Sequence, residues 1–347
     1  MTNILYGVNG EGAGHSTRAR EVITHLQHGG HKVLVASFDR GLQNLRDFDI
    51  TEIFGFRFSF INNRVRYRRT VVKNLATMPQ AVRSVKRLND LVRDRDIELV
   101  ITDFEPLTCQ VGRRNRLPVI AIDNQHCLTN TDVTYPRKYR RDAAAAKLVT
   151  RFMTPRADAY LTTSFFSAKV KRTKTFLFPP ILRRQILEAQ PQEGDRVLVY
   201  VTSPAPSLSK LLASVRASFT AYGFNKEGRQ GNVHFKKPSL DGFLADLVNA
   251  KAIIANAGFS LVTEALQLGK PYLAVPVKYQ FEQIFNAYWV DKMGYGAYWD
   301  DLSREKVESF LYNLPMFREK LTTYPRQGNG ALFAKLDELI GQVTHAK

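Results

Sequence analysis

The sequence predicts an α/β protein with two Rossmann-like domains, each a doubly wound parallel sheet between helices. Three observations predict this class. Apolar strand-like runs alternate with helix-forming stretches, a glycine-rich turn follows the first of these runs, and the alternation starts again after a Pro-rich stretch. A chain of 347 residues suits two domains of ordinary size, and two such domains imply a cleft between them.

The first half opens with a strand, a glycine loop, a helix and a second strand within about 35 residues, which is a βαβ unit and predicts a parallel sheet. The helix runs from His15 or Ser16 to about His28, where Gly29 and Gly30 end it. Strands are expected at 3–8, 31–38, 51–56, 99–102, 119–122 and 159–162, and the later part of 57–95 is expected to be helical.

A Pro pair and a polar run with Pro191 and Gly194 predict a linker before the second half. The second half repeats the alternation of strands and helices. Its strands are expected at 196–203, 219–222, 232–235, 252–255 and 272–275, and its helices at 208–217, 241–249, from 281, and at 303–313 and 329–345. The predicted domains are 1–175 and 196–325, with a linker at 176–195 and a C-terminal helix within 326–347.

The composition is that of a folded protein, with 44% apolar and 24% charged residues. No apolar run approaches the roughly 18 residues of a membrane span, and the first residues lack the pattern of a secretory signal. Two cysteines, Cys109 and Cys127, predict a reducing compartment without a structural disulfide. The expected location is the cytoplasm.

The net charge of +18 is concentrated in the first half, where residues 1–175 carry 30 Lys and Arg against 16 Asp and Glu. This excess predicts an anionic partner: nucleic acid, lipid headgroups or a phosphorylated substrate. In the segment 57–95, arginines and lysines alternate with aromatic residues, which suits an anionic membrane surface. A nucleic-acid backbone or a solvated helix face would fit the same pattern, and we rank nucleic acid below the membrane.

The first glycine loop, GVNGEGAGH, contains Gly12 and Gly14 and ends in His15. It lacks the dinucleotide spacing G-x-G-x-x-G, and no acidic residue ends the second strand. Either it is a tight turn with a His near a helix start, or the backbone passes close to a ligand while His15 acts as a general base. In the second reading, Gly12 and Gly14 belong to the acceptor side.

Asp103 ends a strand, and Glu105 follows two residues later. The pair could bind a divalent metal, Asp103 could orient His15 as an acid does in a catalytic triad, or the residues could cap a helix. We favour orientation of His15, because no third oxygen ligand is evident nearby. Another strand leads to Asn124, Gln125 and His126, which either contact an acceptor or form a surface loop.

In the second half, VTSPAPS follows a strand, and Thr202 and Ser203 are candidate phosphate contacts. Phe243 either stacks on a base or packs in a helix core. The stretch 255–296 is the most specific one. There, Asn256, Ala257 and Gly258 separate a strand from a helix, and such a turn offers backbone N–H groups to an anion.

The stretch 255–296 resembles the donor-binding motif of GT-B glycosyltransferases such as the UDP-glycosyltransferases and the N-acetylglucosaminyltransferase of peptidoglycan synthesis. The likeness is carried by Asn256-Ala-Gly258, Thr263-Glu264-Ala265, Gly269-Lys-Pro271, Pro276, Glu282-Gln283 and Asn286-Ala287, and the loop ending in His15 is similar to the family's first loop. Two features depart from it. Many members have His where this chain has Asn256, and VTSPAPS lacks the glycines common in that loop.

The resemblance implies that Gly258, Phe259 and Ser260 hold the donor pyrophosphate, that Glu264 holds the ribose, and that Glu282 and Gln283 contact the donor sugar. It implies a GT-B fold, a nucleotide-sugar donor with UDP as the family expectation, and no metal or cofactor, because helix N-terminal amides meet the charge of the leaving group.

The predicted function is inverting transfer of a sugar to a hydroxyl of a lipid-linked or anionic acceptor by a cytoplasmic protein at the inner membrane face. Two alternatives stay open. One is a sugar-nucleotide epimerase, which would need further acid or base groups near the sugar. The other is a non-catalytic protein that binds a nucleotide sugar or a nucleic acid, which the basic surface permits but His15, Glu264, Glu282 and Gln283 disfavour.

Overall fold

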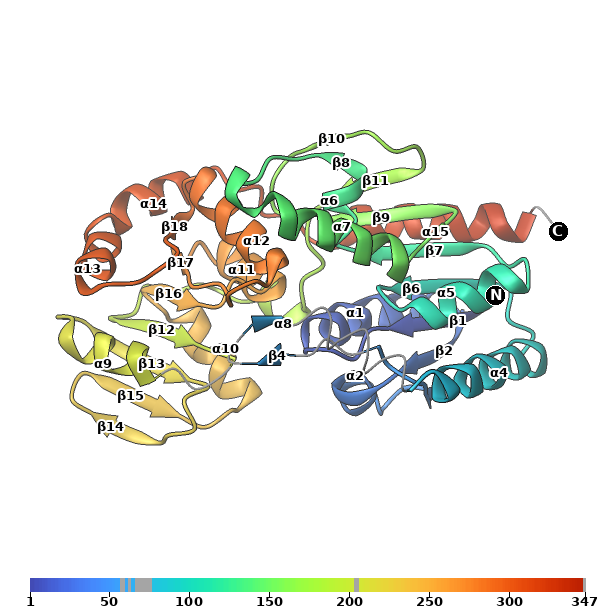
Figure 1. The fold of residues 1–347 in the computed structure, drawn as a ribbon, viewed down its shortest axis with the longest axis horizontal. Helices are drawn as coiled ribbons and strands as arrows, with labels where there is room; N and C mark the ends of the chain where they lie inside the picture. Colours follow the sequence, from blue (N-terminus) through green and yellow to red (C-terminus); the bar gives the residue numbers. More distant parts are fainter. Residues whose placement is uncertain (57–59, 62–63, 66–76, 203–205, 346–347) are drawn as a thin grey trace. The chain divides into compact units, whose positions relative to one another are not determined.

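The computed structural model describes residues 1–56, 60–61, 64–65, 77–202 and 206–345 (Figure 1). The chain divides into two compact units. The first contains most of the chain up to Arg183 together with the residues from Gln327 onwards, and the second contains Arg184–Arg326. Each unit is built on one seven-stranded sheet, so the predicted α/β class with two Rossmann-like domains is confirmed.

The first sheet is entirely parallel, with the order β11-β9-β7-β6-β1-β2-β3. Its strands are β1 (Asn3–Val8), β2 (Lys32–Ser37), β3 (Ile50–Glu52), β6 (Leu99–Asp103), β7 (Val119–Asp123), β9 (Ala159–Thr163) and β11 (Thr175–Phe178). Two-stranded sheets are formed by β4 (Phe60–Ile61) with β5 (Arg64–Val65) and by β8 (Thr131–Asp132) with β10 (Lys169–Val170).

Alternate residues of β1 pack on opposite faces of this sheet, because successive side chains in a strand point to opposite sides. Ile4, Tyr6 and Val8 share one core cluster, and Leu5 belongs to the other. The helices of this unit are α1 (Gly14–His28), α2 (Asp39–Asn44), α4 (Met78–Asp94), α5 (Pro106–Arg114), α6 (Cys127–Asn130), α7 (Arg140–Met153) and α15 (Gly330–His345), with a 3-10 turn at Arg137–Tyr139.

The C-terminal helix α15 returns to the first unit and completes its core. Leu332, Leu336 and Ile340 pack in one cluster with residues of β7 and β9, beside which the red helix lies in Figure 1. Asn329, just before α15, is buried and hydrogen-bonds both the N–H and the C=O of Leu182. Helix α15 is therefore part of the fold of the first unit.

The second sheet has the order β14-β15-β13-β12-β16-β17-β18, and β14 is its one antiparallel strand. Its strands are β12 (Arg196–Tyr200), β13 (Ser218–Tyr222), β14 (Gly228–Gln230), β15 (Val233–Lys236), β16 (Ala252–Ala255), β17 (Tyr272–Ala274) and β18 (Gly296–Tyr298). The helices of this unit are α8 (Arg184–Leu187), α9 (Pro206–Ser214), α10 (Leu240–Val248), α11 (Phe259–Gln267), α12 (Phe281–Lys292), α13 (Arg304–Tyr312) and α14 (Leu314–Leu321).

Most predicted strands and helices are confirmed within a few residues, and three regions differ. Strand β3 ends at Glu52, earlier than predicted; beyond it the N–H of Ile53 donates to the carbonyl of Ser37 at 3.0 Å and the N–H of Phe54 to Ser84 Oγ of α4 at 2.8 Å. The predicted linker starts with β11, which pairs with β9, and contains α8. A second helix, α14, directly follows α13, where the sequence predicted one helix.

Both cysteines are buried and free. Among the described residues, no helix is both long enough and apolar enough to span a bilayer. Residues 57–59, 62–63 and 66–76 of the predicted basic segment, and Ser203, lie outside the described residues.

Candidate functional site

The first sheet reverses its strand order between β1 and β6. From β1 the order runs to β2 and β3 on one side, and from β6 it runs to β7, β9 and β11 on the other. In doubly wound sheets, ligands bind outside the carboxyl ends of the strands at such a switch point. Here the glycine loop follows β1 and Asp103 ends β6, so both predicted features lie at this point.

His15 and Asp103 are in direct contact at the switch point. His15 lies in the first turn of α1, and its Nδ1 is 2.7 Å from Oδ1 of Asp103. Nδ1 also lies 2.8 Å from Nη2 of Arg18, which donates to the same Asp103 Oδ1. We assign a proton to Nδ1, because a carboxylate oxygen approaches a ring nitrogen this closely only through a shared hydrogen. Nε2 then carries the lone pair. The His15 side chain is 15% exposed, whereas Asp103 is fully buried.

Arg18, one turn further along α1, binds the same carboxylate next to His15, with its Nη2 at 2.8 Å from His15 Nδ1. Its Nε donates to Asp103 Oδ2 at 2.6 Å, and its Nη2 donates to Asp103 Oδ1 at 2.5 Å. Its Nη1 donates to Oδ1 of Asn124 at 2.7 Å. Such a two-pronged pair fixes the orientation of the carboxylate as well as its charge. The sequence offered Arg18 as an anion contact next to His15, and the anion that it contacts here is the carboxylate of Asp103.

These contacts keep the buried carboxylate ionised. Burial alone would raise the pKa of Asp103, but the charge of Arg18, the electrostatic interaction with His15 and the hydrogen bonds from both outweigh it and lower the pKa. For Arg18, burial opposes the charge, but Asp103 raises the pKa above its ordinary value. Tyr6 of β1 is also fully buried, and burial, followed by the charge of Asp103, raises its pKa well above the usual range. Asp103 is thus a fixed negative charge behind His15.

Glu105 has a different role from Asp103 and caps α5. Its carboxylate accepts hydrogen bonds from the N–H groups of Leu107 and Thr108 and from Oγ1 of Thr108. Burial raises the pKa of Glu105, and the three bonds oppose that rise. Phe104, between the two carboxylates, has a φ of +54°, which is uncommon for a residue with a side chain and turns the chain sharply after Asp103.

Asn124 and His126 are buried, so the alternative of a surface loop is wrong. Asn124 is 7% exposed and accepts from Arg18, and His126 is 2% exposed. His126 Nδ1 lies 2.7 Å from Asp123 Oδ2. Its ring packs on the ring of Tyr160, with 4.7 Å between the two ring centroids. The burial separates His126 from solvent, whereas His15 remains partly open. Gln125, between them, is half-buried.

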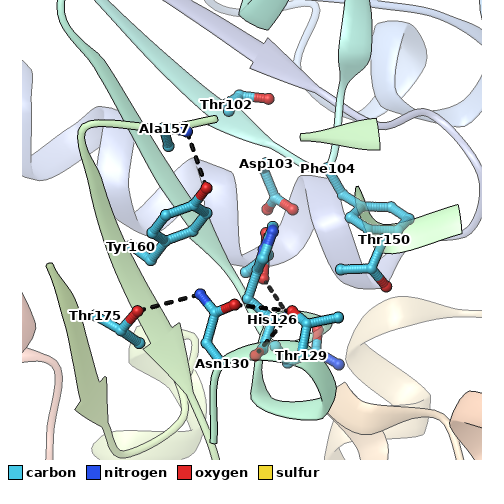
Figure 2. A network of polar contacts seen from close by, with 12 residues as sticks. Thr102, Asp103, Phe104, His126, Thr129, Asn130, Thr150, Ala157, Tyr160 and Thr175 are labelled. Carbon is cyan, nitrogen blue, oxygen red and sulfur yellow. Dashed lines mark hydrogen bonds and ion pairs between the residues drawn. The ribbon is translucent and has the colours of Figure 1, made fainter. Parts of the chain in front are cut away.

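Polar and ring contacts around His126 reach Tyr160 of β9 and, through Thr129 and Asn130, Thr175 of β11 (Figure 2). Thr129 donates to Asn130 Oδ1 at 2.9 Å, and Asn130 Nδ2 donates to Thr175 of β11 at 3.1 Å. Tyr160 of β9 accepts from the N–H of Ala157 at 3.0 Å. We interpret His126 as part of this supporting network, and His15 as the histidine available to a substrate.

The glycine loop passes close to the end of β2. A Cβ added at Gly10 would lie 1.9 Å from the carbonyl oxygen of Phe38, so glycine is required for this approach. Gly12 has a φ of +82° and open space around it, and Gly14 is the first residue of α1. The Oδ1 of Asn9 accepts from the N–H of Glu11 at 2.8 Å and holds the turn.

The second sheet has an equivalent switch point between β12 and β16. Helix α11 begins there, after Gly258, whose φ is −65° and ψ 137°. A Cβ at Gly258 would meet nothing within 4 Å, so the space in front of the helix is open. Phe259 and Ser260 form the first turn and are half-buried. The N-terminal position of this turn and the helix dipole favour an anion.

Three amide side chains predicted from the motif hold the backbone of the second unit. Asn256 Oδ1 accepts from the N–H of Thr202 at 2.8 Å and from its Oγ1 at 3.1 Å, and Asn256 Nδ2 donates to the carbonyl of Val275. Gln283 Oε1 accepts from the N–H of Val277, and Asn286 donates to the carbonyl of Ala257. These bonds fix the loops after β12, β16 and β17 around the start of α11.

Glu264 lies in the second turn of α11 and is 2% exposed, and Glu282, in the first turn of α12, is half-buried. Phe243 of α10 is half-buried and makes edge contacts with Tyr200 and Tyr222, at the ends of β12 and β13. No group of three or more His, Cys, Asp or Glu suited to a metal ion occurs in the part of the chain that the structure describes.

The chain was compared with known proteins. A sequence model described as glycosyl transferase family 1 matches residues 2–315. No curated protein matches the chain by sequence. Solved structures that resemble it include the glycotransferase of kitacinnamycin, with 16% identity, a TM-score of 0.70 and coverage of 98% of both chains.

Two further structures are similar over almost their whole length. LpCGTa, solved in complex with UDP, is 17% identical, has a TM-score of 0.69, and the match covers 99% of both chains. MurG of Acinetobacter baumannii is 15% identical, has a TM-score of 0.63, and the match covers 99% of this chain and all of that one. At these identities the structural likeness concerns the fold.

Proposed function

Because the chain belongs to glycosyl transferase family 1 and has the GT-B fold, we propose that it transfers a hexosyl group from a UDP-sugar to an acceptor hydroxyl with inversion. The acceptor is lipid-linked or anionic. The observation that carries the proposal is the 2.7 Å contact between His15 Nδ1 and Asp103 at the switch point of the first sheet. Family membership favours transfer over the epimerase and binding-protein alternatives.

In this proposal His15 is the general base. The lone pair on Nε2 takes the proton from the acceptor hydroxyl as its oxygen attacks the anomeric carbon and the bond to the diphosphate breaks. Asp103 fixes the tautomer and stabilises the imidazolium that forms, and Arg18 holds Asp103 in place. Attack from the face opposite the leaving group gives inversion.

The donor belongs to the second unit. The open N-terminus of α11 at Gly258, Phe259 and Ser260 would receive the negative charge that develops on the leaving diphosphate. Backbone amides there supply this stabilisation without requiring a metal ion. A structure similar to this chain contains UDP, which supports UDP as the nucleotide. Glu264 is assigned to the ribose. Glu282 is assigned to the sugar, together with the Nε2 group of Gln283, whose Oε1 accepts from the N–H of Val277.

Glu264→Gln should raise the KM for the donor about tenfold or more, since a hydrogen bond to a charged group is lost. The exchange keeps the size of the buried side chain and so tests the carboxylate itself. The donor is found first by thermal shift with UDP-, GDP- and dTDP-sugars, because a bound ligand stabilises the folded state.

Glu308→Gln is the matched control for Glu264→Gln, because Glu308 lies on α13 and pairs only at the surface with Arg304. An unchanged donor KM in Glu264→Gln would remove Glu264 from the ribose site. Absence of a shift with every nucleotide sugar would contradict the proposed function itself.

A membrane-facing acceptor is supported by α7. Leu148 and Phe152, one turn apart on this helix, are 68% and 60% exposed, and the exposed Arg141 and Arg151 lie on the same helix. Exposed apolar side chains next to cations suit a membrane interface, in which the apolar side chains insert and the cations contact anionic headgroups. We therefore place the protein at the cytoplasmic face of a membrane.

Binding to anionic phosphatidylserine vesicles should fall steeply between low and high salt, and it should be weak on neutral phosphatidylcholine vesicles. Phe152→Ser should bind phosphatidylserine vesicles more weakly than the wild type does. Tyr312→Ser, a change at an 85% exposed ring of the other unit, should bind them as the wild type does. Vesicle co-sedimentation measures the effect of salt, of lipid charge and of each of the two substitutions. Equal binding to both lipids would contradict the membrane contact.

A further inference from the structure

The first unit contains a cavity of about 560 Å³ at the carboxyl ends of β2 and β3, beside α4. Phe38, Ile53 and Phe54 form apolar parts of its wall, and Asp39 and Glu52 contribute carboxylates from the two strand ends. It therefore lies on the edge of the sheet where doubly wound proteins bind ligands. The donor features described above belong to the other unit, so they leave this cavity without a function.

Helix α4 presents a polar stripe to the cavity. Gln80, Ser84 and Arg87 lie along one line of the helix, with Arg83 beside them, because residues three and four apart are neighbours on a helix surface. The neighbouring stripe packs in the core and consists of Ala81, Val85, Leu88 and Val92. The two arginines thus belong to the wall of the cavity.

Arg83 and Arg87 make no hydrogen bond or ion pair with any described residue, Asp39 and Glu52 included. Further along the same helix, Arg93 pairs with Asp90, and Arg95, which follows it, pairs with Asp49. Two guanidinium groups that lie one turn apart and have no ion-pair partner among the described residues repel each other mildly and form a fork that suits a planar or tetrahedral oxyanion.

The cavity borders the loop that leads to His15. Phe38, part of its wall, is the residue whose carbonyl lies against Gly10, and Ser37 of β2 donates from its Oγ to the carbonyl of Val8 at 2.8 Å. The end of β2 therefore contacts the start of the glycine loop. A ligand in the cavity occupies the same edge of the first sheet as the candidate base.

We propose that this cavity is an acceptor subsite, in which Arg83 and Arg87 bind a phosphate or carboxylate group of the acceptor while Asp39 and Glu52 accept hydrogen bonds from its hydroxyls. This inference rests on the proposed function and names the acceptor class, a polyhydroxylated oxyanion. The guanidinium groups select the anion, and the carboxylates opposite them disfavour an anion without hydroxyl donors.

The test measures binding of glucose 6-phosphate and glucuronate to the full-length protein by calorimetry, with saturating UDP present to occupy the nucleotide site. Arg83→Gln and Arg87→Gln should each weaken binding of one or both ligands about tenfold, since each removes charge-assisted hydrogen bonds. Lys86→Gln, an exposed neighbour on α4 outside the cavity wall, is the matched control and should leave both affinities within about twofold.

The phosphate and carboxylate ligands identify which oxyanion the subsite prefers, and glucose, which has no charge, should bind at least about tenfold more weakly than the preferred one. Equal losses in Lys86→Gln and Arg83→Gln, or equal affinity for glucose, would overturn the subsite. Failure of UDP to bind would contradict the proposed function and not the subsite. In that case the affinities of the Arg and Lys variants for the two ligands, measured without UDP, would still decide whether the cavity binds an oxyanion.

Discussion

Replacing His15 with alanine should lower kcat about 10²- to 10⁴-fold and leave donor affinity within about twofold, because a positioned general base contributes on that scale. The variant loses Nε2, the group that takes the acceptor proton, while the donor groups of the second unit are untouched. Steady-state kinetics with the donor found by thermal shift give kcat, and calorimetry with UDP gives the affinity.

His28→Ala is the control for this prediction. His28 is exposed at the last turn of the same helix, so its removal should change kcat by less than about twofold. If His15→Ala retained the wild-type kcat, or if the loss appeared only as weaker binding of UDP, His15 would not be the base. Release of UDP should stop together with glycoside formation, since both depend on the same attack.

The sequence predicted the two sheets because buried parallel strands are short continuous apolar runs that alternate with helices. It did not predict the partner of the last helix. Leu332, Leu336 and Ile340 show that α15 has an apolar stripe, but a stripe does not say which surface it covers. That choice depends on the free face of the first sheet and on Asn329, which attaches the chain to Leu182.

The contact between His15 and Asp103 followed from a topological rule, because the ends of neighbouring parallel strands share one edge. Arg18 was expected only as an anion contact next to His15, and its burial against Asp103 was not foreseen, since a cation in a helix is usually solvated. One signal could have revealed it. Arg18, Val22 and Leu26 are four residues apart, so Arg18 continues a buried apolar stripe, and a charge in that place requires a buried partner.

The donor motif shows a different limit of the sequence. Asn256, Gln283 and Asn286 were expected near a ligand or between ligand contacts, but each of them hydrogen-bonds the protein's own backbone around α11. An amide that supports a loop and an amide that binds a ligand have the same residue type and spacing. Only the positions of neighbouring carbonyl and N–H groups separate the two roles.

Arg18→Leu should destabilise the protein by about 3–5 kcal/mol at neutral pH, the usual result of removing one partner from a buried ion pair. Asp103 is fully buried and the Arg18 side chain is 6% exposed, so solvent cannot replace the lost guanidinium. Urea unfolding followed by fluorescence gives the free energy of unfolding. If the pair were dispensable, the leucine variant would unfold at the wild-type midpoint.

Arg20→Leu is the matched control, because Arg20 lies two residues further on α1 and makes a similar two-pronged pair with Asp47. That pair is at the surface, with side chains 41% and 55% exposed, so its loss should cost less than about 1 kcal/mol. If both variants lost the same free energy of unfolding, burial would not increase the contribution of the Arg18 pair to stability.

The pH dependence of the Arg18→Leu variant separates the charge from simple packing. In the wild type, the pKa of Asp103 is lowered, so its contribution to stability is present above the unfolded value of about 4 and is lost only as the pH falls through the lower folded value. Without Arg18, the folded variant relieves the buried charge by binding a proton on Asp103, because burial favours the neutral carboxyl. It then binds more protons than the unfolded chain, and the difference in unfolding free energy from the wild type should shrink as the pH falls from 8 to 5. A difference that stays constant over this range would assign the loss to packing of the arginine stem instead of to its charge.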